Sequence, residues 1–588
     1  MFLPTTREEM KKLSWDKLDV IIVTGDTYID SPYIGAAVIG RVLQAAGYKV
    51  GIIAQPDTES EIDINRLGEP TLFWGVTAGS VDSMVANYTA LKKRRRKDDF
   101  TPGGKNTRRP DRASIVYSNL IRKYFKNTKP IVLGGIEASL RRITHYDYWD
   151  DKIRRAILFD AKADILVYGM GEKSILKLAH NLQTGKDWKD IRGLCYISPH
   201  PKEEYTILPS YQEVKEDKKK FISMFHTFYL NNDSLTAKGL CQQQDSRYLI
   251  QNPPIYPLTR KELDRVHDLP YEREVHPHYK KEGEVKALET IKFSITTHRG
   301  CYGECNFCSI TVHQGKVIQE RSEKSILREA KLLAKLRDFK GYILDVGGPT
   351  ANMYGIECQK KLKSGSCSDK RCLYPQFCSR LNINHKKQME ILKKIRQIGG
   401  VKKVFVASGI RYDMVLSDQK YGERYLCELV KYHISGQLKI APEHTENDVL
   451  EKMGKPDQGC LKRFRDKFLQ INKEQKKKQF LTYYLIAAHP GCREEDMYRL
   501  KEYTSKELRL NPKQIQIFTP TPSTYSTLMY YTEIDPFTGR AIYVEKNLKK
   551  KERQKGIVVE KKVNSNRNFI LNHHINKSVI YFYLLFNF

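Results

Sequence analysis

The chain has 588 residues, of which 40% are hydrophobic and 29% are charged. This composition excludes a fibrous or disordered chain and indicates a globular protein of about two to four domains. The formal net charge is +32, from 101 basic and 69 acidic residues. Such an excess makes an anionic partner a candidate, RNA above all, although solvated lysine-rich surface explains the charge equally well because no RNA-reading motif accompanies it.

The two ends of the chain contain no targeting or membrane signal. The first 20 residues mix acids and a proline with their bases and lack the apolar core of a secretory signal. The apolar run at 578–588 has 11 residues, whereas a helix needs about 20 to cross a bilayer. We therefore expect a cytoplasmic protein with no membrane segment, whose residues 531–588 form a basic C-terminal tail.

The first predicted unit covers residues 1–195. An apolar, β-branched strand pattern at 18–32 is followed by a helical pattern to residue 47 and by a second strand pattern at 48–57. Strand, helix and strand at this spacing are typical of a parallel sheet. Further strand patterns at 69–79, 129–139 and 163–172 predict an open, doubly wound parallel-sheet domain.

Two segments of this half of the chain lack such periodicity. Residues 91–112, "LKKRRRKDDFTPGGKNTRRPDR", predict a loop that is either an arm for an anionic substrate or a solvated insertion. Residues 196–284 contain the extended stretch "QNPPIYPLT" and are expected to form a connector.

A second α/β unit is predicted for residues 285–530, with a cysteine-rich insertion at 356–380. Six strand patterns alternate with helical patterns and end in "HRGC", "GGPT", "SGIR", "APEH", "AHPG" and "TPTPS". This alternation favours a partial, TIM-like (β/α)6 barrel, with an open sheet as the alternative, and in both the functional edge lies beyond the carboxyl ends of the strands. The fold class is therefore α/β in both units.

Seven of the twelve cysteines form two dense groups, which are Cys301, Cys305 and Cys308, and Cys358, Cys367, Cys372 and Cys378. In a chain without an export signal, such groups indicate metal binding or reduced thiols. Three cysteines suit a [4Fe–4S] cluster with one iron left open, whereas a structural zinc needs a fourth ligand, for which His298 and His313 are nearby candidates.

The loop "HRGCYGECNFCSI" after the first strand of a βα array resembles the radical S-adenosylmethionine (SAM) superfamily. This resemblance implies that Cys301, Cys305 and Cys308 hold a [4Fe–4S] cluster, that SAM binds its open iron, and that a reductant such as flavodoxin or ferredoxin supplies an electron. It also implies a 5′-deoxyadenosyl radical as the reactive species.

The resemblance extends to the other strand ends. "DVGGPT" lies where the superfamily has a Gly-Gly-Glu-like segment, so Gly347 and Gly348 are expected at the methionyl amino group, although Pro349 replaces the glutamate. Ser408 and Arg411 are expected at the ribose and carboxylate of SAM. A larger set, expected to contact the cofactor or to transfer protons, is Glu443, His444 and His489. Turn formation and strand-end packing are the alternative roles of all these residues.

Longer stretches resemble one family of that superfamily. "GGIEASLRRITHYDYWDDKIRRAILFDAKADILVYGMGE", "LDVGGPTANMYG" and "FTPTPSTYSTLMYYT", together with the cysteine loop, are similar to the YgiQ family over residues 2–555. Residues 556–588 do not resemble that family's usual extension, so we expect an altered or truncated end. The family resemblance implies an enzyme and assigns no reaction.

Two further metal or cofactor sites are left open. Cys358, Cys367, Cys372 and Cys378 are candidates for zinc or a second iron–sulfur centre, with a reduced thiol set as the alternative. The N-terminal sheet is similar to cobalamin-binding domains that precede other radical enzymes, although the turn at 24–35 has no histidine to serve as a lower axial ligand. Three functions remain: a radical SAM enzyme, an RNA-modifying enzyme of that kind, and a non-catalytic iron–sulfur or zinc protein.

Overall fold

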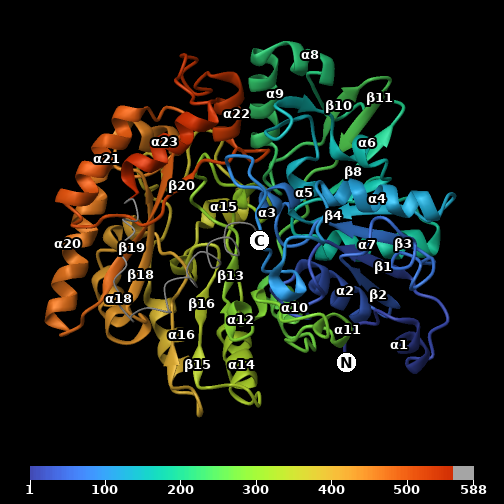
Figure 1. The fold of residues 1–588 in the computed structure, drawn as a ribbon, viewed down its shortest axis with the longest axis horizontal. Helices are drawn as coiled ribbons and strands as arrows, with labels where there is room; N and C mark the ends of the chain where they lie inside the picture. The colour runs from blue at the N-terminus through green and yellow to red at the C-terminus, as the bar shows by residue number, and fades with distance from the viewer. Residues whose placement is uncertain (560–588) are drawn as a thin grey trace, which may run out of the picture.

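The computed structural model describes residues 1–559 and consists of two α/β units placed side by side (Figure 1). The apolar run at 578–588 lies outside the described residues. Within residues 1–559, no helix is both long and apolar enough to cross a membrane. The α/β class predicted from the sequence is confirmed, because strands and helices alternate along both units.

A nine-stranded sheet forms the centre of the first unit. In spatial order its strands are β2 (Val50–Ala54), β1 (Val20–Thr24), β3 (Phe73–Thr77), β4 (Ile131–Gly134), β7 (Ile165–Val167), β8 (Leu194–Ser198), β11 (Arg247–Gln251), β10 (Leu240–Gln244) and β9 (Thr206–Leu208). The first five strands are parallel, and β8, β11 and β10 pair in antiparallel fashion. The strand order changes direction beside β1, as in doubly wound folds.

The sheet extends beyond the unit predicted from the sequence. Residues 196–284, expected as a connector, contribute β9, β10 and β11. The sequence of β10, "LCQQQ", does not show a strand pattern because its inward-facing residues are glutamines. Gln242 and Gln244 are buried and accept hydrogen bonds from the backbone amides of Thr144 and Ala156, at 3.1 and 2.9 Å, so burial does not leave their amide oxygens unpaired.

Helices cover both faces of this sheet, because successive strand residues point to opposite sides. Val20 and Ile22 face one apolar cluster and Ile21 and Val23 face another. The helices of this unit are α1 (Arg7–Lys12), α2 (Gly35–Ala45), α3 (Ser83–Asn87), α4 (Ala113–Tyr124), α5 (Gly135–Leu140), α6 (Ile157–Ala161), α7 (Glu172–Thr184), α8 (Tyr211–Glu216), α9 (Lys218–Leu230), α10 (Arg260–His267), α11 (Pro277–Lys280) and α12 (Ala287–Ile291). A small hairpin, β5 (His145–Asp147) and β6 (Lys152–Arg154), stands apart from the sheet.

The basic segment 91–112 is anchored to the first unit. Arg109 is fully buried, and its guanidinium forms ion pairs with Asp26 at 2.8 Å and with Asp98 at 3.1 Å. Lys93 and Arg108 lie 3.0 and 2.7 Å from acidic side chains elsewhere in the chain. Part of the charge that the sequence offers to an anionic partner is therefore neutralised within the protein.

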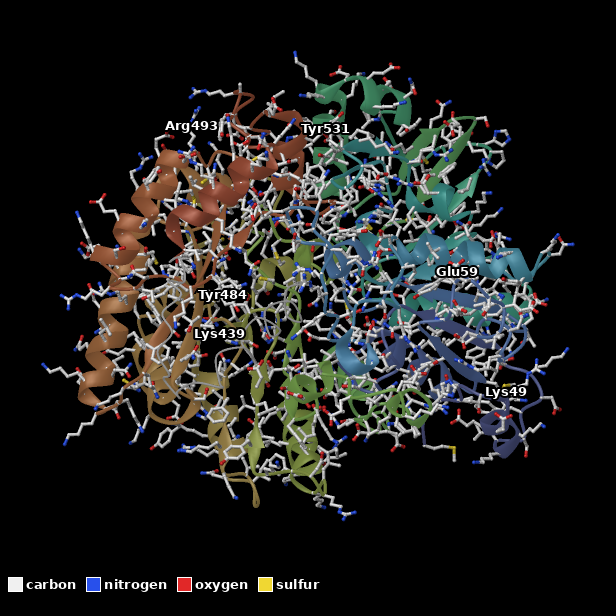
Figure 2. All side chains as sticks on the ribbon, viewed as in Figure 1. Lys49, Glu59, Lys439, Tyr484, Arg493 and Tyr531 are labelled. Atoms are coloured by element: carbon white, nitrogen blue, oxygen red, sulfur yellow. The ribbon has the colours of Figure 1, made fainter. Side chains whose placement is uncertain are left out.

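The second unit contains six parallel strand positions in chain order. These are β12 (Ser294–Thr296), β15 (Tyr342–Ile343) with β16 (Asp345–Gly347), β17 (Lys403–Val404), β18 (Gln437–Glu443), β19 (Phe480–Ala487) and β20 (Gln516–Ile517). A single parallel bridge, from Ile410 to Ile440, joins the third position to the fourth. Figure 2 shows side chains packed throughout, with Lys439 and Tyr484 on the neighbouring strands β18 and β19.

Helices follow each of these strands. They are α13 (Ile310–His313), α14 (Glu323–Ala334), α15 (Gln359–Ser364), α16 (Lys386–Arg396), α17 (Tyr412–Ser417), α18 (Gly422–Glu428), α19 (Asn447–Met453), α20 (Gln458–Glu474), α21 (Glu494–Lys506), α22 (Tyr525–Thr532) and α23 (Leu548–Val558). The short strands β13 (His298–Arg299) and β14 (Gln319–Glu320) flank the cysteine loop. Helix α23, in the segment expected as a tail, contributes Ile557 and Val558 to an apolar cluster beside β19.

Candidate functional site

The three cysteines lie in the loop that follows the first strand of the second unit. The chain leaves β12, passes through β13 and turns at Gly300, whose φ is +84°. A side chain at Gly300 would meet the carbonyl oxygen of Val317 at 2.2 Å, so the turn requires glycine. Cys301, Cys305 and Cys308 follow this turn, all half-buried and unpaired. The carboxyl edge predicted from the sequence is therefore where the structure places them.

These cysteines line one pocket, which we call the cysteine pocket. It encloses about 620 Å³ including its mouth. Its walls come from four successive strand ends, and the lining residues used below are Cys301, Cys305, Cys308, Pro349, Thr350, Arg411, Glu443 and Lys455. Loops far apart in the sequence thus meet around the three thiols, as expected for the carboxyl edge of parallel strands.

Ionic contacts hold the middle of the cysteine loop in place. Glu304, at φ +47°, lies 3.2 Å from the Lys316 ammonium and 3.4 Å from that of Lys361. Burial alone would raise the pKa of Glu304, but these lysines and Arg371 outweigh it and lower the pKa to about 2. Glu304 is therefore ionised at neutral pH and fixes the backbone between Cys301 and Cys305.

Two of the three thiols, those of Cys301 and Cys308, are protonated without a metal. Burial, together with the neighbouring Cys305, raises the pKa of Cys301, and burial raises that of Cys308 well above its ordinary value. Metal binding would release these protons, because thiolates are the ligands. Within residues 1–559, no group of three or more His, Cys, Asp or Glu side chains is close enough together to hold a single ion. Three thiols in one loop match the number of protein ligands of a [4Fe–4S] cluster that leaves one iron open.

Arg411 lies at the edge of this thiol group. Its guanidinium pairs with Asp413 through two nitrogens, one of them at 2.9 Å, and its third nitrogen lies 3.5 Å from the Cys305 sulfur. Both partners are almost fully buried. The resemblance seen in the sequence predicts Arg411 near the carboxylate of SAM. The structure places it in the cysteine pocket, with Asp413, which the sequence analysis did not single out, as its partner.

Glu443 and Lys455 also line the cysteine pocket. Glu443 ends β18 with φ +70°, a backbone conformation that non-glycine residues rarely adopt. Burial raises the pKa of Glu443 to about 7, although Lys455 and Arg411 act in the opposite direction. A carboxyl group that titrates near neutrality in a strained strand end is typical of a functional position. Lys455 was missed by the sequence analysis, since "GKP" after a helix reads as a turn.

The other residues expected to bind SAM lie beside the pocket. The Ser408 hydroxyl is fully buried and donates to Asp345, so it is already engaged. The Gly347 carbonyl accepts from the Thr297 amide at 2.7 Å. A side chain at Gly348 would meet His298 at 2.7 Å, so that glycine allows two strand ends to touch. Of the segment "GGPT", Pro349 and Thr350 reach the cysteine pocket.

The candidate histidines are engaged elsewhere. His444 lies 3.6 Å from the Cys492 sulfur and accepts from the Glu446 amide at 3.1 Å. His489 contacts the Ser526 hydroxyl at 2.7 Å and the Pro490 carbonyl at 2.8 Å. Neither lines the cysteine pocket. Their strand-end positions were read correctly from the sequence, but their contacts are those of packing residues.

The second cysteine group lies against the first. Cys358 and Cys372 are buried in an apolar cluster with Tyr302, and Cys301 and Cys378 pack at its edge. The Cys367 sulfur lies 3.1 Å from the Lys360 ammonium. The insertion also supplies Lys361 and Arg371, which contact Glu304. It therefore supports the cysteine loop through packing and charge.

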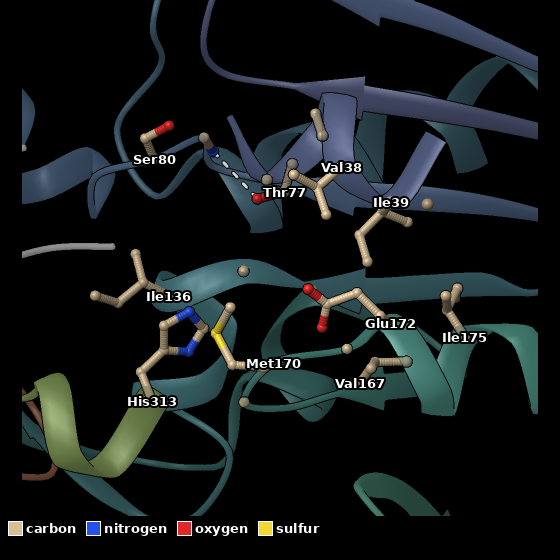
Figure 3. A pocket seen from close by; sticks show the side chains of 18 of the residues that line it. Val38, Ile39, Thr77, Ser80, Ile136, Val167, Met170, Glu172, Ile175 and His313 are labelled. Atoms are coloured by element: carbon tan, nitrogen blue, oxygen red, sulfur yellow. Dashed lines mark hydrogen bonds between the residues drawn. The ribbon is translucent and has the colours of Figure 1, made fainter. Parts of the chain in front are cut away.

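A larger cavity, which we call the interdomain pocket, lies between the two units and encloses about 1430 Å³ including its mouth (Figure 3). The ends of β1, β3, β4 and β7 form one side, and Thr296, His298, Arg299, Gly348 and Pro349 of the second unit form the other. His313 also lines it, so both histidines considered as a fourth zinc ligand face this pocket and not the cysteines. Pro349 lines both pockets.

Comparison with known proteins identifies the family. The family model described as Radical SAM N-terminal matches residues 2–294. UPF0313 protein FN0734 of Fusobacterium nucleatum is 61% identical over 96% of this chain and 99% of its own length. A UPF0313 protein of Thermotoga neapolitana is 51% identical over 96% of this chain and 99% of its own. The chain belongs to the UPF0313 family, the YgiQ family of radical SAM proteins. It is thus a radical SAM enzyme.

Solved structures show a fold like that of this UPF0313 chain. TsrM, a radical SAM methyltransferase of Kitasatospora setae solved with cobalamin and a [4Fe–4S] cluster, has a TM-score of 0.51. It is 14% identical, and the match covers 86% of this chain and 73% of TsrM. At this identity the match shows a shared fold. The YgiQ resemblance predicted from the sequence is confirmed, and family membership sets aside the non-catalytic alternative.

Proposed function

We propose that this UPF0313 protein binds a [4Fe–4S] cluster through Cys301, Cys305 and Cys308 and binds SAM in the cysteine pocket. The observation that supports this most directly is the meeting of three thiols with Arg411, Glu443 and Lys455 in one pocket at the carboxyl edge of the second unit. When bound and reduced, the cluster would supply the one electron that breaks a carbon–sulfur bond of SAM and yields methionine and a 5′-deoxyadenosyl radical. The six strand positions that surround this edge are proposed to form the partial (β/α)6 barrel.

The chain's own residues have distinct tasks in this proposal. The three cysteines would leave one iron without a protein ligand. Arg411, held by Asp413, brings positive charge to the Cys305 sulfur and lowers the cost of the net negative charge of a thiolate-ligated cluster. Glu443 and Lys455 offer a carboxyl and an ammonium group to the amino and carboxylate groups of SAM. Glu304 holds the loop that carries the cysteines.

The test is formation of 5′-deoxyadenosine by anaerobically reconstituted protein with SAM and dithionite, or with flavodoxin or ferredoxin as the proposed physiological reductant. Wild type and Cys427→Ala, which alters a half-buried cysteine of α18 outside the pocket, should form it. Cys305→Ala should not. Absence of 5′-deoxyadenosine from wild type that contains about four iron atoms and four sulfides per chain would contradict the proposal.

We also propose cobalamin as a second ligand, held in the interdomain pocket. The solved TsrM structure contains cobalamin with its cluster and shares the fold. The residues here fit such a large molecule. The pocket lies at the carboxyl edge of a doubly wound sheet and has glycines in its wall and unpaired polar atoms at its mouth. Stoichiometric binding of hydroxocobalamin, measured by equilibrium dialysis, tests this part independently of SAM cleavage.

RNA modification remains a separate proposal that rests on the net charge of +32. Electrostatic RNA binding weakens steeply with salt, by about 10³-fold or more between 50 and 200 mM for six or more phosphate contacts. Filter binding of bulk tRNA at these two salt concentrations is the measurement. A change smaller than about threefold would contradict an extended RNA surface.

A further inference from the structure

From the carboxyl ends of the strands, the interdomain pocket continues toward their amino ends as an apolar trough along one face of the first sheet. Ile22, Gly75 and Val132 lie opposite one another on β1, β3 and β4, and Val20 and Phe73 lie two residues deeper. A larger set of residues closes the trough from the helix side, namely Ala36, Val38 and Ile39 of α2 and Ile175 of α7. From Thr24 to Val20 the trough is about 13 Å deep, at about 3.3 Å per residue.

Three glycines keep this trough open. Gly35, Gly75 and Gly134 all line it, and none has a positive φ. A side chain at Gly35 would meet nothing within 4 Å, and one at Gly134 would come no closer than 3.9 Å to any atom. At Gly75 the nearest atom would be 3.5 Å away, an ordinary contact. Neither backbone conformation nor crowding therefore requires glycine at these positions, and the space is available to a ligand.

The mouth of the pocket has the opposite character. Glu172, His267 and His298 are almost fully buried there, and each has at least one side-chain atom with no hydrogen-bond partner. Such atoms are costly to bury unless a ligand or water pairs with them. Both histidines are neutral at physiological pH, because burial lowers the pKa of His298 to about 4 and lowers that of His267 well below its ordinary value. The mouth can thus donate to and accept from neutral groups.

This distribution disfavours a nucleotide diphosphate, the usual ligand of a doubly wound sheet. Among the lining residues that lie within 1–559, Arg299 is the one base besides the histidines, and its guanidinium already pairs with Glu172. The turn after β1 begins with Gly25 and Asp26, and the Asp26 carboxylate is unfavourable beside the two phosphates of a dinucleotide even though it pairs with Arg109. Cobalamin fits better, because its ring carries neutral carboxamides around the edge, its nucleotide tail carries the single charge of one phosphodiester, and that tail ends in an apolar bicyclic base.

We propose that the trough takes the nucleotide base of cobalamin, which is thereby displaced from cobalt, while the corrin ring occupies the mouth and faces Gly348 and Pro349. The turn between β1 and α2 contains no histidine that could replace the base as an axial ligand from the sheet side. The base, and not the ring, therefore accounts for the apolar depth of the site. This inference rests on the cobalamin part of the proposed function.

The test compares cobalamin with cobinamide, which has the corrin ring but no nucleotide base. Wild type should bind hydroxocobalamin at least tenfold more tightly than aquacobinamide, and the absorption spectrum of bound cob(II)alamin should be that of the base-displaced form. Gly134→Leu, which fills the trough, should bring the two affinities within about twofold while leaving cobinamide binding unchanged. Gly399→Leu, at an exposed glycine with nothing within 4 Å, is the matched control and should behave as wild type.

Equal wild-type affinities for the two corrinoids, or bound cobalamin that keeps its base on cobalt, would overturn the inference while leaving cobalamin as a ligand. Binding of neither corrinoid would overturn both. In each case the formation of 5′-deoxyadenosine by the same preparation reports on the radical proposal separately. If the circular dichroism spectrum shows that Gly134→Leu does not fold, Gly35→Leu at the first turn of α2 is the second variant. It should likewise lose the preference for cobalamin over cobinamide.

Discussion

The cysteine pocket and the interdomain pocket are neighbours with contrasting walls. The cysteine pocket is lined by reactive and charged side chains, which neutralise one another through contacts such as that of Arg411 with Asp413. The interdomain pocket owes its volume to glycines and its polar character to atoms without partners. The comparison shows two ways to form a site: one pocket is defined by charged side chains that line it, and the other by glycines, whose missing side chains leave space for a ligand.

The largest effect should separate the two cysteine groups. Cys308→Ala removes a proposed cluster ligand and should reduce the iron content from about four atoms per chain to nearly none. Cys372→Ala, in the apolar cluster beside the loop, should leave the iron content unchanged. Iron and sulfide analysis after anaerobic reconstitution is the measurement. Loss of metal from both variants would show that the two groups act as one metal site.

Asp413→Ala tests how far the cysteine pocket depends on its ion pair. The substitution leaves the Arg411 guanidinium buried without its partner, which should cost about 3–5 kcal/mol of unfolding free energy. Urea unfolding followed by circular dichroism is the measurement. Asp413→Asn keeps the shape and one hydrogen-bond acceptor and should cost less. Equal stability of Asp413→Ala and wild type would mean that Arg411 finds another partner.

A pair of glycines should distinguish filled from open space. A side chain at Gly348 would meet both the ring and the backbone of His298 at 2.7 Å, so Gly348→Ala should destabilise the protein by about 1–3 kcal/mol. The added methyl group of Gly134→Ala would come no closer than 3.9 Å to any atom, and the backbone there is extended, so this variant should be neutral or stabilising by up to about 1 kcal/mol. Thermal unfolding of the two variants side by side is the measurement. Comparable destabilisation by both would contradict the open trough.

The pH dependence of stability should reveal the raised pKa of Glu443. Because burial raises its pKa from 4.5 to about 7, the folded protein binds more protons than the unfolded chain between these values. This contribution to stability is present at low pH and is lost as the pH rises through 7, by about 1.4 kcal/mol between pH 6 and pH 8. Glu443→Gln should lack this loss, as measured by urea unfolding at the two pH values. An identical pH dependence in wild type and variant would mean that the pKa of Glu443 is not raised.

Much of the architecture could be predicted because it follows from apolar periodicity. The strand patterns at 18–32, 69–79 and 129–139 contain β1, β3 and β4, and the cysteine loop was expected at a strand's carboxyl end. The antiparallel extension was missed because Gln242 and Gln244 of β10 are buried polar residues whose partners are distant in the chain. Hydrophobic periodicity predicts which side of a strand faces a core, but it does not predict a backbone amide that pairs with a buried polar side chain on that side.

The candidate site was predictable where chemistry resides in a local motif and not where it depends on how strand ends turn. Cys301, Cys305 and Cys308 share one loop, so their meeting followed from eight residues. His444 and His489 also end strands, yet the backbone turns them toward Cys492 and Ser526. Lys455 lines the pocket and Asp413 holds Arg411 in place there, and both stand at helix termini that carry no motif. The doublet of Gly134, which ends β4, and Gly135 was the one signal in the sequence that could have indicated the trough.

The wall at Pro349 gives the two pockets a thermodynamic relation. Pro349, whose φ is fixed by its ring, lines both pockets, so a displacement of its backbone by a ligand in one pocket would change the shape of the other. If a ligand in one pocket changed the affinity of the other pocket for its ligand by some factor, the second ligand would change the affinity for the first by the same factor, since linkage is reciprocal. Coupling of this kind would need no movement of one α/β unit against the other.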